Sequence, residues 1–148
     1  MPAAVVDLTG PNAKIDAGSW YDVSIPINDV NGDPFIMTSG PFTVDAATAQ
    51  FRLGPDEAGD PLIELDLISS VAADGGADGV VISDGFVRLS INDATSAAVS
   101  YDIGGTDLPF VDNRDGYYSV EIESSGVRLR VVEGQYEMTA ETTRQDLP

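Results

Sequence analysis

The sequence contains no cysteine and no histidine among its 148 residues. These absences exclude disulfide bonds, cysteine-based zinc sites, Cys–His or Ser–His catalysis and a histidine pH switch. A single domain of this length can still bury a sizeable core without such staples. The remaining reactive groups are carboxylates, hydroxyls, one lysine and six arginines. They form no catalytic pattern along the chain, so we expect neither enzymatic activity nor a cofactor.

Positive charge is also scarce. Seven basic residues stand against 25 acidic ones, which gives a formal net charge of −18. Such a field repels nucleic acid and anionic membranes, so we expect neither as a partner. No apolar run approaches the roughly 20 residues that cross a bilayer. Residues 1–10 lack the basic and apolar regions of a signal peptide.

Short segments of alternating apolar and polar residues dominate the chain. Bounded by Gly, Pro, Asn and Asp, such segments are typical of β-strands. Pro26 cannot donate to a ladder, which predicts an edge strand there. Asp84-Gly85 predicts a tight hairpin, and the pair Val131-Val132 before Gly134 predicts a β-bulge. The segments with this pattern are 20–27, 42–53, 62–67, 80–83, 86–91, 117–123 and 127–138.

These strands predict an all-β fold, an antiparallel β-sandwich of the immunoglobulin-like type. The one expected helix is short, covers residues 92–99 and begins with a cap from Asn92 or Asp93. We expect an N-terminal arm at 1–12, the sandwich at 13–138 and a C-terminal tail at 139–148. The side chains predicted to face the core are Val23, Ile25, Ile27, Leu65, Val87, Leu89, Ile91, Val120, Ile122, Leu129 and Val131.

Two groups of charged residues are candidate sites. Asp29, Asn31 and Asp33 match the first half of a calcium loop, but Pro34 stands where such a loop needs glycine, and a hairpin turn is the simpler interpretation. Glu121 and Glu123 share the outer face of one strand, and Arg128 and Arg130 share that of the next. Cross-strand ion pairs account for all four without a binding site.

Trp20 is the only tryptophan and stands at the start of a strand. Its side chain could pack in the core or an interface, or it could serve as a stacking platform for sugars or bases. Packing is the favoured interpretation. Since a lectin-like site needs an exposed aromatic platform, a carbohydrate-binding sandwich remains an alternative function that rests on fold analogy.

The order of short motifs resembles that of a known group of proteins. The motifs are "NGDP" (31–34), "FIMTSG" (35–40), "TAQFRL" (48–53), "GVVIS" (79–83), "GFVRLSI" (85–91), "NDATSAAV" (92–99), "YSVEI" (118–122), "GVRLRVVEG" (126–134) and "ETTR" (141–144). In this order they resemble small tailed-phage virion proteins related to the N-terminal domain of the baseplate upper protein. The resemblance implies a β-sandwich like that domain and a structural role in a virion, at the tail baseplate or fibre attachment. It implies no catalytic residues. A capsid decoration (cement) protein is the alternative.

A virion role predicts contacts with other phage structural proteins and with further copies of the chain, in a ring or trimer. We expect the contacts in three segments, 1–12, 102–115 and 139–148, because apolar residues outside the strand pattern often mark interfaces. Arginines in these segments are the expected partners for acidic neighbours. The candidate contact residues are Val5, Val6, Leu8, Leu108, Phe110, Arg114 and Arg144.

Overall fold

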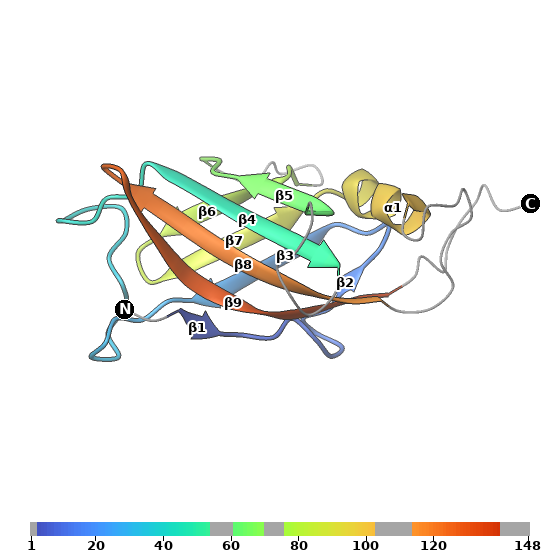
Figure 1. Cartoon of the computed structure of the whole chain (residues 1–148), viewed down its shortest axis with the longest axis horizontal. Helices are drawn as coiled ribbons and strands as arrows, with labels where there is room; N and C mark the ends of the chain where they lie inside the picture. Colours follow the sequence, from blue (N-terminus) through green and yellow to red (C-terminus); the bar gives the residue numbers. More distant parts are fainter. Residues whose placement is uncertain (1–2, 54–60, 70–75, 103–113, 140–148) are drawn as a thin grey trace, which may run out of the picture.

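The computed structural model describes residues 3–53, 61–69, 76–102 and 114–139. Nearly all of its regular structure is β, and it has one short helix (Figure 1), so the predicted all-β sandwich is confirmed. The strands are β1 (Ala4–Val5), β2 (Ile15–Asp16), β3 (Tyr21–Pro26), β4 (Ala46–Leu53), β5 (Ile63–Asp66), β6 (Gly79–Ser83), β7 (Phe86–Ile91), β8 (Arg114–Ser124) and β9 (Val127–Thr139), and the helix is α1 (Asp93–Asp102).

The strands form two sheets that lie one behind the other in Figure 1. Sheet A has the order β1-β9-β8-β4-β5, with β2 also paired to β9, and sheet B has the order β3-β7-β6. All pairs are antiparallel except β1 and β2, which run parallel to β9. A bridge between Leu67 and Val80 joins the two sheets at one edge. No helix in the described residues is long and apolar enough to span a membrane.

The core lies between the sheets and follows the predicted alternation. Phe51 is central to it and packs against Tyr118 and Tyr136, with ring centroids 5.6 Å and 5.3 Å apart. Val23 and Leu129 are only partly buried. Val23 lies on an edge strand, and Leu129 lies close to the turn of the β8–β9 hairpin. The predicted core residues that are buried are Ile25, Ile27, Leu65, Val87, Leu89, Ile91, Val120, Ile122 and Val131.

Local signals in the sequence place several features correctly. Pro26 lies on β3, an edge strand of sheet B, and Asp84-Gly85 joins β6 to β7. The helix begins at Asp93 as expected but extends to Asp102. Asn92 caps it, since its Oδ1 accepts a hydrogen bond of 2.9 Å from the backbone N–H of Ala94.

The predicted bulge lies in β9. Val120 pairs with Val132 and Glu121 pairs with Arg130, so Val131 is the extra residue. Both valines are buried although they are adjacent. The outward positions therefore change from even to odd numbers, and Glu133 joins Arg128 and Arg130 on the outer face of sheet A.

The described part of the expected N-terminal arm, residues 3–12, packs along the edge of sheet A. β1 continues sheet A beside β9, and the N–H groups of Val6 and Leu8 donate to the carbonyls of Glu133 and Gln135 at 2.9 and 2.8 Å. The side chain of Leu8 is only 1% exposed. The segment packs here because the edge of β9 carries backbone N–H and C=O groups that require hydrogen-bond partners. The same edge leaves a position in the core that one apolar side chain can fill.

Candidate functional site

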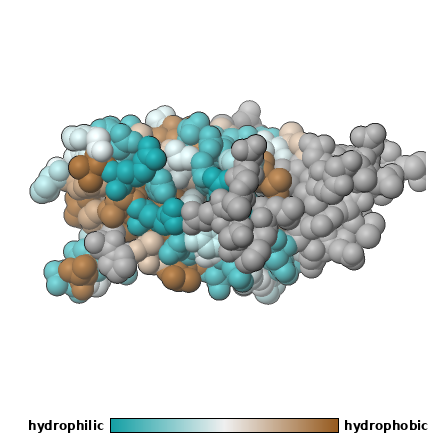
Figure 2. Space-filling view, viewed as in Figure 1, coloured by the Kyte–Doolittle hydropathy of each residue, from teal (hydrophilic) through white to brown (hydrophobic). Residues whose placement is uncertain are grey.

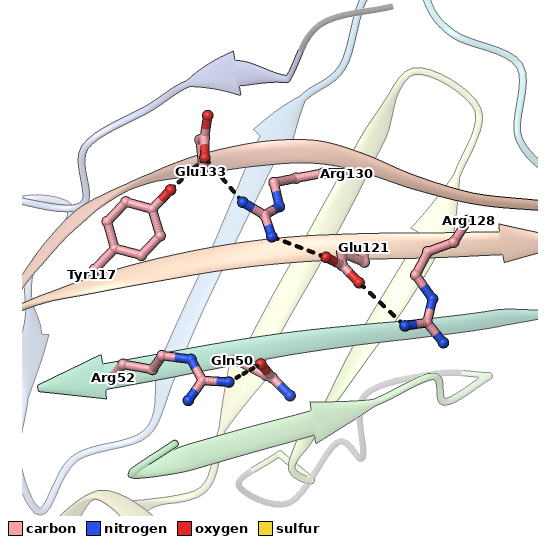
Figure 3. A network of polar contacts seen from close by, with 7 residues as sticks. All are labelled: Gln50, Arg52, Tyr117, Glu121, Arg128, Arg130 and Glu133. Atoms are coloured by element: carbon pink, nitrogen blue, oxygen red, sulfur yellow. Dashed lines mark hydrogen bonds and ion pairs between the residues drawn. The ribbon is translucent and has the colours of Figure 1, made fainter. Parts of the chain in front are cut away.

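The outer face of sheet A carries a network of arginines and glutamates (Figure 3). Arg130 lies between two carboxylates, with Nη2 3.1 Å from Glu121 Oε2 and Nη1 3.4 Å from Glu133 Oε2. The hydroxyl of Tyr117 donates to Glu133. The bulge at Val131 places Glu133 on this face. The four residues expected to pair across the hairpin do not include Glu133.

Arg128 extends the network toward the turn of the β8–β9 hairpin. Its Nη1 lies 3.8 Å from Glu121 Oε1, and its Nη2 lies 3.7 Å from Glu123 Oε2. The predicted cross-strand pairing of these residues is confirmed. Ion pairs as exposed as these contribute at most about 1 kcal/mol each to the stability of the fold. The main effect of the network is therefore to neutralise charges on this face.

A second row of polar contacts crosses the face on β4 and β5. Arg52 Nη2 donates to Gln50 Oε1 at 2.6 Å, and Gln50 Nε2 donates to Glu64 Oε2 at 2.7 Å. These contacts run in one direction, from the guanidinium through the amide to the carboxylate. The sequence does not predict this row, because the neighbours of β4 in the sheet are not visible in the sequence.

A hollow of about 220 Å³ lies between the two rows. Its outward-facing floor consists of small side chains, among them Ala46, Thr48 and Ser119. Each carboxylate that lines it, Glu64, Glu121 and Glu123, already contacts a glutamine or arginine side chain. Figure 2 shows mainly hydrophilic residues over the coloured part of this face. Its full lining is Ala46, Ala47, Thr48, Gln50, Glu64, Ser119, Glu121, Ile122, Glu123 and Arg128.

The candidate calcium residues form a turn. Asp29 Oδ1 accepts hydrogen bonds from the N–H groups of Asn31 at 2.8 Å and Asp33 at 3.1 Å. A bridge between Asn28 and Pro34 closes the loop. This geometry is that of an Asx turn and supports the hairpin-turn interpretation. Across the described ranges, no three or more acidic side chains are grouped so that they could hold a metal ion.

The end of the sandwich away from α1 is built from residues 28–45 and from two hairpin turns (left in Figure 1). Asp84, in the β6–β7 turn, accepts hydrogen bonds from the N–H groups of Met37 and Thr38 at 2.9 and 2.8 Å and from the Thr38 hydroxyl at 2.9 Å. These hydrogen bonds hold the pKa of Asp84 below its usual value. In the β8–β9 turn, the N–H of Ser125 donates to Asp45 Oδ2 at 3.0 Å. Aspartates therefore fasten this loop to both turns.

Apolar side chains are exposed at this fastened end. They belong to Val30, Ile36 and Val127, and Val127 is 60% exposed. We call these three residues the apolar tip. Brown surface is visible at the same end in Figure 2. The sequence does not indicate the tip, because Val127 appears in it only as one residue of an alternating strand.

The candidate contact residues lie in different environments. Val5 is exposed and Val6 is partly buried against the core. Leu8 is buried within its own chain, so its side chain is not accessible to a partner, contrary to the expected contact role. Arg114 begins β8, and nothing is described of its side chain. Leu108, Phe110 and Arg144 lie outside the described residues.

Comparison with protein-family models, with curated proteins and with solved structures finds no match to this chain.

Proposed function

We propose that the protein is a non-enzymatic structural component of a tailed-phage virion that acts through contact surfaces. The observation that carries a contact role is the apolar tip. Val30, Ile36 and Val127 are exposed on an end whose backbone is held by Asp29, Asp45 and Asp84. A rigid apolar surface loses little conformational entropy when a partner covers it.

A non-enzymatic role is supported by the way in which the polar groups are used. On the outer face of sheet A, arginines and glutamates bind one another. Inside the sandwich, the hydroxyls of Tyr21, Tyr118 and Tyr136 donate to backbone carbonyls. These side chains stabilise the fold or keep it soluble, and each already forms a hydrogen bond or an ion pair within the chain.

The assignment to a virion rests on the ordered sequence motifs, and so does the preference for the tail baseplate or fibre attachment. A capsid decoration protein would use the same rigid tip and the same acidic surface, so it remains the second candidate. Mass spectrometry of purified virions, separated into heads and tails, tests both. The chain should be found in the tail fraction. Its presence in heads alone would favour decoration, and its absence from both would contradict a virion role.

The tip itself can be tested by substitution. Val127→Asp introduces a charge into the apolar tip and should reduce the copy number of the chain in particles. Gln135→Glu adds the same charge at an exposed position of the same strand and serves as the control. If both variants enter particles at the normal copy number, the tip is not the contact surface.

A further inference from the structure

The outer face of sheet B, opposite the arginine–glutamate network, exposes two aromatic side chains. Trp20 is 40% exposed and Phe86 is 38% exposed. Both point away from the core, since the residues that follow them, Tyr21 and Val87, point inward and are buried. Two large aromatic side chains are therefore exposed on one face of sheet B.

The indole of Trp20 is held in a fixed position. Its Nε1 donates a hydrogen bond of 2.8 Å to the hydroxyl of Ser90, which lies on the same outer face and is completely buried. The backbone of Gly76 lies directly against the ring, because a Cβ at Gly76 would fall 2.1 Å from Nε1. Trp20 is therefore a preorganised platform, and a ligand would not have to pay for ordering it.

A second apolar platform lies at the other end of the same face. Phe86 pairs with Pro26 across the ladder, and both are exposed. Phe86 lies four positions before Ser90 in β7, which corresponds to about 13 Å along the strand. A ligand that touches both platforms must therefore be extended, and a single sugar ring is too short.

A charged pair lies between the two platforms. Arg88 Nε and Nη2 donate to Asp22 Oδ1 and Oδ2 at 2.7 and 2.6 Å. Both side chains are about one-third exposed. The guanidinium has donors beyond these two bonds, and the carboxylate has further lone pairs. Alternating donors and acceptors of this kind suit the hydroxyl groups of sugars.

The charge of this face differs from that of the chain. The strands of sheet B contain one acidic and one basic residue, Asp22 and Arg88, and their charges cancel. The whole chain carries −18, which disfavours a nucleic acid as the molecule stacked on the aromatic rings. The charges on the strands between the two platforms therefore cancel, which suits a neutral ligand.

From these observations we infer that the outer face of sheet B binds an extended chain of neutral sugars. The apolar faces of sugar rings stack on Trp20 and on Phe86, and hydroxyl groups between them bind the Asp22–Arg88 pair. This inference does not depend on the virion role, since the apolar tip and this face are different surfaces.

The sole tryptophan makes a direct test possible. The full chain is titrated with cellohexaose, maltohexaose and chitohexaose while Trp20 emission and its quenching by acrylamide are followed. At least one hexasaccharide should shift the emission and protect Trp20 from acrylamide, and the matching disaccharide should bind about tenfold or more weakly. If no hexasaccharide changes either signal, or if the disaccharide binds equally well, the inference is wrong.

Variants test whether both platforms are used. Phe86→Ala should weaken hexasaccharide binding by about tenfold, the loss expected for one stacking contact. Val127→Ala removes an exposed apolar side chain from the tip and should leave the affinity unchanged. Circular dichroism checks that each variant is folded. If Phe86→Ala binds like the parent chain, or if Val127→Ala is equally impaired, the extended site is refuted. Binding of a protein partner that Phe86→Ala abolishes, without any sugar binding, would make the face a protein interface and would also refute it.

Discussion

Gly134 lies so close to the carbonyl oxygen of Val6 that a Cβ at position 134 would fall 2.3 Å from it. The absence of a side chain thus lets the N-terminal segment pack directly on β9. Tyr118, the cross-strand partner of Gly134, donates its hydroxyl to the same Val6 carbonyl at 2.5 Å. The backbone of Val6 is therefore held at its carbonyl by Tyr118 and at its N–H by the carbonyl of Glu133.

Gly134→Ala should displace the N-terminal segment from β9. The backbone of Val6 cannot move without loss of its hydrogen bonds, so we expect a destabilisation of about 1–3 kcal/mol, as for other forced overpacking. Urea unfolding followed by circular dichroism measures it, with Gln135→Ala as the control on the same strand. Hydrogen exchange should show faster exchange at the N–H groups of Val6 and Leu8, and unchanged protection there would contradict this account.

Leu8→Ala should cost about 2–5 kcal/mol, the range for a large side chain removed from a core. The reason is that Leu8 is buried within the sandwich. Val5→Ala, at an exposed position of the same segment, should change stability by less than about 0.5 kcal/mol. Equal, small effects of the two substitutions would show that the segment is detached in solution.

Acid should weaken the loop at residues 28–45. The pKa of Asp84 is lowered by hydrogen bonds to the N–H groups of Thr38 and Met37. A folded-state pKa below the unfolded one means that the stabilisation is present above the unfolded pKa and is lost as the pH falls through the folded pKa. Asp84→Asn should thus be less stable than the parent chain at pH 7. The difference should narrow below about pH 4, as judged by thermal unfolding across a pH series. A gap that stays constant over the series would rule out the Asp84 carboxylate as its cause.

Alkali should unfold the protein through its buried tyrosines. Burial raises the pKa of Tyr136 to about 12 and also raises the pKa of Tyr21 and of Tyr118. Because these phenols favour the protonated form when folded, stability is complete below about pH 10 and falls as the pH rises through the folded values. Ultraviolet titration should show these three tyrosines ionising late and together with unfolding. Ionisation of all five tyrosines near pH 10 in the folded state would contradict their burial.

The strands were predictable because a sheet with one buried face imposes period two on its sequence. The bulge was predictable because Val131 and Val132 are two adjacent apolar residues in an otherwise alternating strand. The Arg–Glu pairs followed from the hairpin, which sets β8 beside β9. Within the candidate site, only the contacts of this hairpin were therefore accessible from the sequence.

The attachment of the N-terminal segment was not predictable. β1 and β2 have two residues each, too few to show alternation, and their partners in β9 are more than one hundred residues away. The hydrogen bonds from Thr38 to Asp84 and from Ser125 to Asp45 also join distant parts of the chain. An aspartate in a turn looks the same in the sequence whether it caps its own loop or another one.

The extra residue at Val131 makes β9 tolerant of a change in length at one point. If Val131 is removed, Arg130 still points outward and Val132 inward, so the inside–outside phase of both halves of the strand is preserved. A deletion at most other positions of β9 would turn half of the strand inside out. What the shortened strand would lose is local curvature, since a bulge increases twist. β1 pairs at Val132 and Glu133, directly after the bulge. The bend thus sets the direction in which the edge of β9 meets the N-terminal segment. Deletion of a residue at this position would change how the N-terminal segment packs on β9 before it changed the core.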